Sequence, residues 1–193
     1  MNTHLQIEHR NVDGLRPTDT RLLKSPLDFI SEDHLRVRTM CAEIEAALSA
    51  EDLGDHEILR IRTFLVQDMP LLLQDEDCDL LPLLAERAEP DDEVPRLKAR
   101  LDQEHATILE SLPTLVRLFS GPRSAWSAAD TTLCKGFLSN VRRHIILENA
   151  IMLPLARVRL NAADLRKLRH VMLRRRGLSD RVLPDRDAVK CTS

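Results

Sequence analysis

Apolar side chains recur every three or four residues in four separate stretches of this chain. That interval places them along one face of an α-helix, so the pattern predicts four amphipathic helices. The stretches run from 30 to 48, from 58 to 83, from 97 to 119 and from 137 to 155, with polar segments between them. Short connections make consecutive helices antiparallel neighbours. The sequence therefore predicts an all-α fold, an antiparallel four-helix bundle.

The same pattern divides the 193 residues into four parts. We expect an N-terminal arm over residues 1–25, the bundle over 26–158, a short C-terminal helix over 159–177, and a polar tail over 178–193. Pro70 lies inside the second stretch and predicts a kink or an irregular turn. Composition agrees with helices, because the chain has only five Gly, no Tyr and one Trp, whereas sandwiches and barrels need more aromatic residues and Gly turns.

Charge and hydropathy exclude several classes of partner. With 28 basic and 31 acidic residues the net charge is −3, which gives no strong field for nucleic acid. The longest apolar runs, such as 80–84, fall far short of the ~20 residues needed to span a bilayer, and residues 1–25 have no signal-peptide core. Four widely spaced Cys form no Cys-x-x-Cys pair and predict reduced thiols. We therefore expect a cytoplasmic protein with neither a nucleic acid nor a membrane as partner.

Five polar residues interrupt the apolar stripes at positions where burial is expected. They are His34, Glu76, His105, His144 and Glu148. Burying a carboxylate without a partner costs several kcal/mol or raises its pKa. Some compensating group must therefore lie near them.

An internal repeat brings most of these residues into one frame. Segment 80–83 aligns with 152–155, and segment 32–34 aligns with 103–105. In each copy a Glu, either Glu76 or Glu148, stands six residues before a Pro. The chain thus reads as two helical hairpins in tandem, each with one His followed by Glu-x5-Pro. Two such hairpins packed with approximate two-fold symmetry would place His34, Glu76, His105 and Glu148 around one point.

The second hairpin adds His144, four residues before Glu148, so both side chains project from one helix face. The equivalent position in the first hairpin is Leu72, which cannot bind a metal. Imidazole and carboxylate together suit Fe, Mn or Zn. The order His-x3-Glu differs from the Glu-x-x-His of ferritin-like bundles and argues against that class.

These motifs resemble the hemerythrin-like, or HHE cation-binding, family, over roughly residues 26–177. The resemblance implies a four-helix bundle with a non-haem, usually di-iron, centre, linked to oxygen binding or sensing, nitric oxide response, and iron storage or repair. It implies that Glu76 and Glu148 bridge the metals, that His105 and His144 bind one iron, and that His34 binds the other.

Two positions depart from the family pattern. Leu72 stands where members place a His, and Leu109 stands where oxygen carriers can place a further His. The centre could hold two irons with one weak position, one metal, or none. Asp75 and Asp79 lie close enough in sequence to substitute, but we expect both to face solvent. We also expect the basic residues between 166 and 176 to form a solvated helix end.

The expected function is a non-haem iron protein with one or two ions, Mn or Zn being alternatives. It would bind or sense O2 or NO, or handle iron, and we expect a binding protein rather than a turnover enzyme. The alternative is a degenerate bundle that acts as an interaction module without a functional metal. The sequence does not identify a redox partner, and it is compatible with a homodimer.

Overall fold

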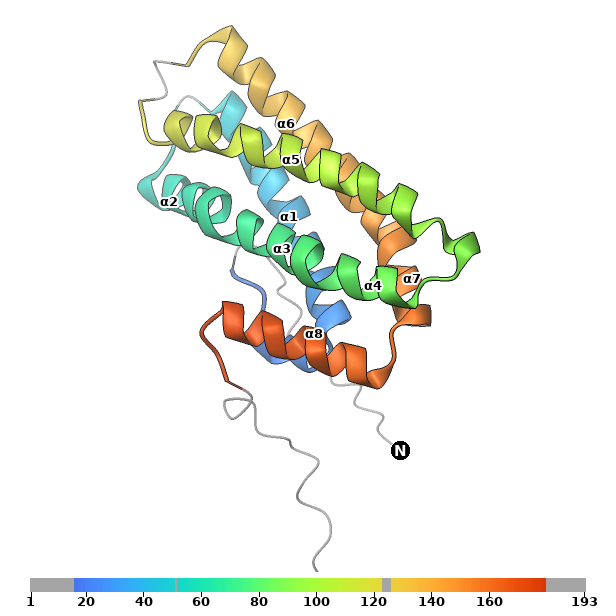
Figure 1. Ribbon diagram of the computed structural model, residues 1–193. Coiled ribbons are helices and arrows are strands. Elements are labelled where there is room, and N and C mark those ends of the chain that lie inside the picture. Colours follow the sequence, from blue (N-terminus) through green and yellow to red (C-terminus); the bar gives the residue numbers. More distant parts are fainter. Residues whose placement is uncertain (1–15, 51, 123–125, 180–193) are drawn as a thin grey trace, which may run out of the picture.

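The computed structural model describes residues 16–50, 52–122 and 126–179, and this part of the chain is all α-helical, without strands (Figure 1). The α-helices are α1 (Pro26–Ser49), α2 (Asp55–Thr63), α3 (Met69–Asp75), α4 (Leu81–Arg87), α5 (Val94–Leu118), α6 (Ala128–Leu147), α7 (Leu153–Arg159) and α8 (Ala162–Arg175). Short 3-10 turns, η1 (Thr20–Lys24) and η4 (Pro90–Asp92), precede α1 and α5. Three π-helical turns join consecutive α-helices: η2 (Phe64–Asp68), η3 (Glu76–Leu80) and η6 (Glu148–Met152).

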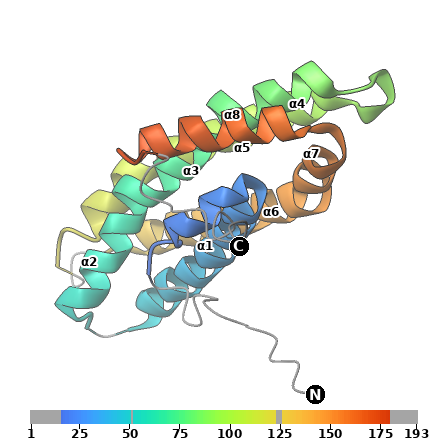
Figure 2. The same ribbon diagram turned by 90° about the horizontal axis from the view of Figure 1, so that it is seen from below.

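The predicted bundle of two hairpins with a short C-terminal helix is confirmed. Helices α2, α3 and α4 run on through η2 and η3 as one long rod, and α6 runs into α7 through η6. With α1 and α5 these rods make four antiparallel helices, in which α1 packs on α6, α6 on α5, and α5 on the rod that contains η2 and α4 (Figure 1). Helix α8 crosses outside this bundle and packs on η1, α1 and η3 (Figures 1 and 2).

Each π-helical turn is followed by a proline at the same distance. Pro70, Pro82 and Pro154 stand six residues after the first residues of η2, η3 and η6. A proline has no N–H and its ring clashes with the carbonyl four residues earlier, and the wider π turn relieves that clash. The irregular turn expected at Pro70 is therefore present. The turn η2 begins at Phe64, whereas η3 and η6 begin at a Glu. The π turn therefore depends on the proline and not on an acidic first residue.

Local sequence also sets the helix ends. Ser127 and Asp130 form a capping box at the start of α6, and Asn161 and Asp164 do the same for α8. Gly177, with φ +67°, follows the end of α8, where the amide of Leu178 bonds to the carbonyl of Leu173. This left-handed position is one that glycine adopts without strain, and it stops the helix.

The core is a single cluster of Leu, Ile, Val, Met and Phe side chains that the four rods share. It extends under α8, where Leu168, Met172 and Leu173 are buried, and under η1, where Leu23 is fully buried. Residues 16–25 of the expected arm thus include a turn packed on the bundle. Residues 1–15 of that arm, and 180–193 of the expected tail, lie outside the described residues.

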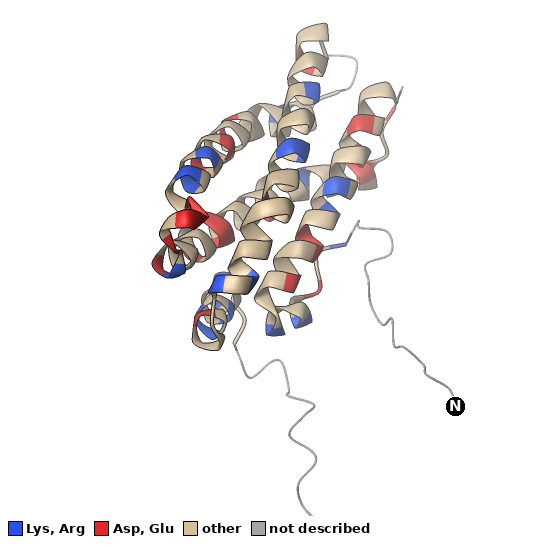
Figure 3. Ribbon diagram, turned by 90° about the vertical axis from the view of Figure 1, so that its right-hand side faces the viewer, with Lys and Arg blue, Asp and Glu red and all other residues tan. Residues whose placement is uncertain are grey.

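The surface carries both signs of charge along the helices (Figure 3). In the described part of the chain, no helix is long and apolar enough to cross a membrane.

Candidate metal centre

The fold brings the five predicted site residues together, and all four rods contribute. His34 comes from α1, His105 from α5 and His144 from α6, while Glu76 and Glu148 are the first residues of η3 and η6. None of the five is more than 2% exposed. Their side chains therefore meet in the bundle interior, away from bulk water.

The imidazole Nε2 atoms point at the two carboxylates. Nε2 of His34 lies 2.9 Å from Oε1 of Glu76 and 3.3 Å from Oε2 of Glu148. Nε2 of His144 lies 3.0 Å from Oε2 of Glu148, as the i, i+4 spacing predicts. Glu148 is thus shared between His34 and His144.

His105 completes the cluster from the facing helix. Its Nε2 lies 3.1 Å from Nε2 of His144, 3.6 Å from Oε1 of Glu148 and 3.8 Å from Oε2 of Glu76. Ligand atoms of Glu76, His105, His144 and Glu148 all lie within 4.8 Å of one another. Such a set has the size and the mixed N/O chemistry that a transition metal needs.

An outer ring of acceptors faces the other imidazole nitrogen of each His. Nδ1 of His34 lies 3.0 Å from Oδ1 of Asn149, and Nδ1 of His105 lies 2.6 Å from Oδ1 of Asp77. Nδ1 of His144 faces Oε2 of Glu104 at 3.5 Å. Sequence reasoning missed these partners, although Asp77 and Asn149 occupy equivalent positions, one residue after Glu76 and Glu148.

The outer ring dictates where the imidazole protons sit. Carboxylate and amide oxygens only accept, so Nδ1 of His34 and Nδ1 of His105 are donors. A neutral imidazole has one N–H, which leaves the Nε2 lone pairs facing carboxylate oxygens. In addition, Oε2 of Glu76 and Oε1 of Glu148 form no hydrogen bond with any described residue. This arrangement is repulsive unless a proton or a metal cation lies among the five groups, so the residues fit a metal ion.

The pKa values also indicate that a positive charge is favoured among these five side chains. Burial alone would lower the pKa values of His34 and His105. The neighbouring carboxylates Glu76 and Glu148 instead raise the pKa of His34 to about 9. In the same way, Asp77 and Glu148 raise the pKa of His105 to about 10. Burial and the charge of Glu148 raise the pKa of Glu76 to about 6. For Glu148, contacts with His105 and His144 outweigh burial and lower the pKa. Protonated imidazoles thus offset the carboxylates in the protein alone.

Leu72 lies where the sequence placed it, one turn before Glu76 in a buried position. The amide of Glu76 bonds to the carbonyl of Leu72, as the amide of Glu148 bonds to that of His144. The backbone of the two hairpins is therefore alike at this point, and only the side chain differs.

The expectation that Asp75 faces solvent is wrong. Asp75 is fully buried, because α8 covers this side of the bundle and its C-terminal end supplies two guanidinium groups. Arg175 bonds to Asp75, and Nη2 of Arg176 lies 2.5 Å from Oδ2 of Asp75. Arg175 also forms an ion pair with Asp79 at 2.5 Å, and the side chain of Asp79 is largely buried as well. These two arginines belong to a buried ion-pair cluster rather than to a solvated helix end.

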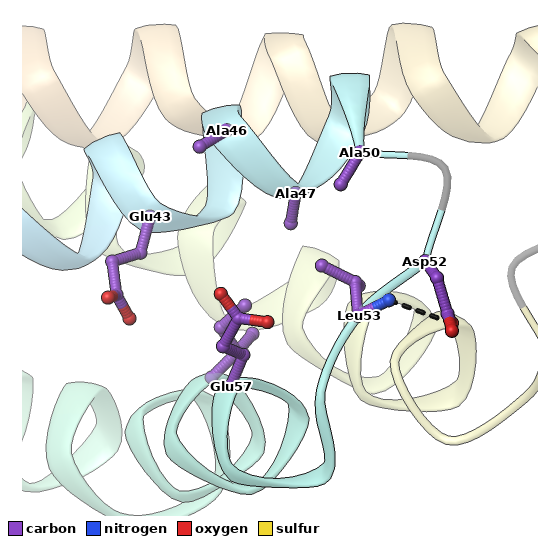
Figure 4. Close-up of a pocket in the computed structure, with 8 residues that line it drawn as sticks. Glu43, Ala46, Ala47, Ala50, Asp52, Leu53 and Glu57 are labelled. Carbon is purple, nitrogen blue, oxygen red and sulfur yellow. Dashed lines mark hydrogen bonds between the residues drawn. The ribbon is translucent and has the colours of Figure 1, made fainter.

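A separate acidic pocket of about 140 Å³ lies between α1 and α2 (Figure 4). Its carboxylates already have partners in the chain. Arg60 binds Glu43, the amide of Gly54 bonds to Glu57, and the amide of Leu53 bonds to Asp52. The described residues that line this pocket include no histidine, and their carboxylates already have partners, so the pocket differs from the His/Glu cluster as a metal site.

One comparison with known proteins matches the chain. A family model described as the hemerythrin HHE cation binding domain matches residues 25–156, the segment that contains all five residues of the cluster. No curated protein and no solved structure gave a significant match.

Proposed function

The chain belongs to the hemerythrin family of HHE cation-binding domains, and we propose that it is a non-haem iron protein that binds or senses O2 or NO. The observation that carries this proposal is the convergence of three imidazole Nε2 atoms on two buried carboxylates. Iron suits this N/O donor set, and Mn or Zn would also bind it.

The distances support an assignment of the residues that would hold the metal. His105 and His144 would hold one ion together with Glu148, since their Nε2 atoms lie 3.1 Å apart. Glu76 and Glu148 each approach His34 as well as His105, so both carboxylates would be available to ions on either side of the cluster. The His34 side has one imidazole instead of two, so a second ion there would be held more weakly.

When bound, reduced iron supplies an open coordination position and electron density for a small diatomic. The chain contributes the surroundings. Burial of all five ligands to 2% exposure or less excludes bulk water from the reacting face. Asp77 and Asn149 hold the imidazoles of His105 and His34 with Nε2 directed inward, which fixes ligand orientation and raises ligand basicity.

The missing imidazole at Leu72 favours some functions over others. A reversible oxygen carrier needs a fully ligated pair of ions, so the reduced donor set makes sensing or scavenging of O2 or NO the better proposal. Nothing in the donor set requires a turnover reaction.

The test is a metal analysis with optical spectra of the purified chain under nitrogen, air and NO. We expect iron at about one ion per chain or more and a visible spectrum that changes on exposure to air or NO. His144→Ala should lose both signals, while His56→Ala, an exposed histidine on α2, should keep them. A folded, colourless protein that refuses Fe(II) would instead support the helical interaction module. Iron without any response to air or NO would support iron handling.

A further inference from the structure

Carboxylates on and next to the π turn η3 face two different parts of the molecule. Glu76 and Asp77 contact histidines of the His/Glu cluster. Asp75 and Asp79 instead contact α8, which packs on this side of the bundle (Figure 2). One short segment of the chain therefore connects the cluster to α8.

The C-terminal end of α8 binds this segment with two guanidinium groups. Arg175 bonds to Asp75 and lies 2.5 Å from Oδ2 of Asp79. Nη2 of Arg176 lies 2.5 Å from the other oxygen of Asp75, Oδ2. Asp75 is fully buried, and charge-assisted bonds between a carboxylate and planar guanidinium groups fix its orientation. These bonds therefore hold the backbone immediately before the π turn.

Contacts from the same side of the bundle hold α1 next to His34. Asp33, the residue directly before His34, is buried and accepts a hydrogen bond of 2.5 Å from Oγ1 of Thr18, close to the start of η1. The guanidinium of Arg176 lies 4.7 Å from the centre of the Phe29 ring of α1, in a cation–π contact. The residues that precede two of the five cluster side chains are thus held by the layer that η1 and α8 form.

The charged contacts distinguish the first hairpin from the second. In the internal repeat, Asp75 and Asp79 correspond to Leu147 and Ile151, which cannot form ion pairs. The arginine contacts thus belong to the hairpin in which Leu72 takes the place of the second imidazole. A set with fewer ligands gains more from a carboxylate that is already held in position, because preorganisation lowers the cost of binding.

We propose that Arg175 and Arg176 are positioning residues for the metal centre, and that they act on Glu76 through Asp75. This inference rests on the proposed function, since it requires a metal ion in the cluster. The two arginines hold the start of η3 so that the carboxylate of Glu76 faces His34. Because coupling between two sites is reciprocal, occupancy of the cluster also strengthens the docking of α8.

A charge-neutral double variant tests the contact. Asp75→Asn/Arg176→Gln removes one charge of each sign, and Arg175 keeps Asp79 as its partner. The net charge beside the cluster stays the same, so a change in charge cannot account for a change in cation affinity. We expect the Fe(II) affinity, measured anaerobically by competition with a chromophoric chelator, to fall about fivefold or more.

The matched control removes the other ion pair of α8. Arg87, at the end of α4, lies 2.9 Å from Asp164 in the first turn of α8, and neither residue adjoins a residue of the cluster. Arg87→Gln/Asp164→Asn is also charge-neutral and loosens α8 at its other end. This control should bind Fe(II) like the native chain.

The outcomes separate this inference from the proposed function. A native chain that binds no Fe(II) would overturn both. A native chain that binds Fe(II) no more tightly than Asp75→Asn/Arg176→Gln would overturn this inference alone. An equal loss of affinity in the control would also overturn it, because the effect would then be a general loosening of α8.

Hydrogen exchange of the native chain gives a second measurement that needs no variant. Fe(II) should slow exchange of the amides in the C-terminal half of α8 by about fivefold or more. The effect should exceed that on α2, the first helix of the rod that contains η3. If the double variant fails to fold by circular dichroism, this measurement decides, and exchange in α8 that Fe(II) leaves unchanged would overturn the proposal.

Discussion

Nδ1 of His105 lies 2.6 Å from Oδ1 of Asp77, the residue directly after Glu76. The other hairpin repeats this relationship, because Nδ1 of His34 lies 3.0 Å from Oδ1 of Asn149, the residue directly after Glu148. Each hairpin thus supplies a carboxylate to the cluster and, one residue later, an acceptor that orients the histidine of the other hairpin. The two-fold repeat therefore couples the hairpins through the histidines as well as through the core.

The first prediction concerns this outer contact. Asp77→Ala should weaken metal binding by about 10- to 100-fold, because His105 then loses the acceptor that directs its Nε2 inward. The measurement is a competition titration against a chromophoric chelator. Asp102→Ala, which removes an exposed carboxylate paired with Lys98, is the matched control and should bind like the native chain. Equal affinities for Asp77→Ala and the native chain would show that the contact does not orient a ligand.

Restoring the missing imidazole is the second test. Leu72→His should raise the amount of metal bound per chain, because the backbone before Glu76 matches that before Glu148. Metal per chain and the charge-transfer spectrum report the gain. Leu73→His places a histidine at the neighbouring buried position and should cost stability without adding metal. If Leu72→His binds no more metal than Leu73→His, the first hairpin does not contribute a ligand set at this point.

The third prediction is a pH dependence. The pKa of His34 is raised to about 9 and that of His105 to about 10, so both imidazoles hold a proton at neutral pH in the metal-free protein. A metal must displace these protons, and its apparent affinity should therefore fall as pH drops from 8 to 6, by about tenfold per pH unit for each proton released. Titration calorimetry in buffers with different ionisation enthalpies counts the protons. Affinity that is independent of pH over this range would contradict protonated imidazoles in the cluster.

Removal of the α8 arginines gives the fourth prediction. Arg175→Gln/Arg176→Gln should lower the free energy of unfolding by about 3–5 kcal/mol, because Asp75 would remain as an uncompensated buried charge. Urea unfolding of the metal-free protein measures this loss. Adding Asp75→Asn to the double variant removes the buried charge and should restore part of the stability. A double variant as stable as the native chain would show that Asp75 does not depend on these partners.

Much of the fold was predictable because the information is local. The apolar spacing sets the helices, and a proline inside a helix sets the irregular turn before it, as at Pro70. The five residues of the cluster could be named for the same reason, since His34, His105 and His144 interrupt apolar stripes in a repeated frame.

The parts that escaped prediction depend on distant partners. Asp75 is buried because Arg175 and Arg176 reach it from about 100 residues later in the chain, and no local pattern indicates that contact. Asp77 and Asn149 could have been found from their equivalent positions after the two Glu residues, but the pairing with the opposite hairpin requires the fold.

An anaerobic Fe(II) titration of the chain measures whether the buried His/Glu cluster binds a metal. After removal of free metal, we expect about one to two irons per native chain and little or none in a His144→Ala/Glu148→Gln variant that keeps its helical circular dichroism. A folded native chain that retains no iron, or a variant that retains as much as the native chain, would show that the cluster is not a metal site.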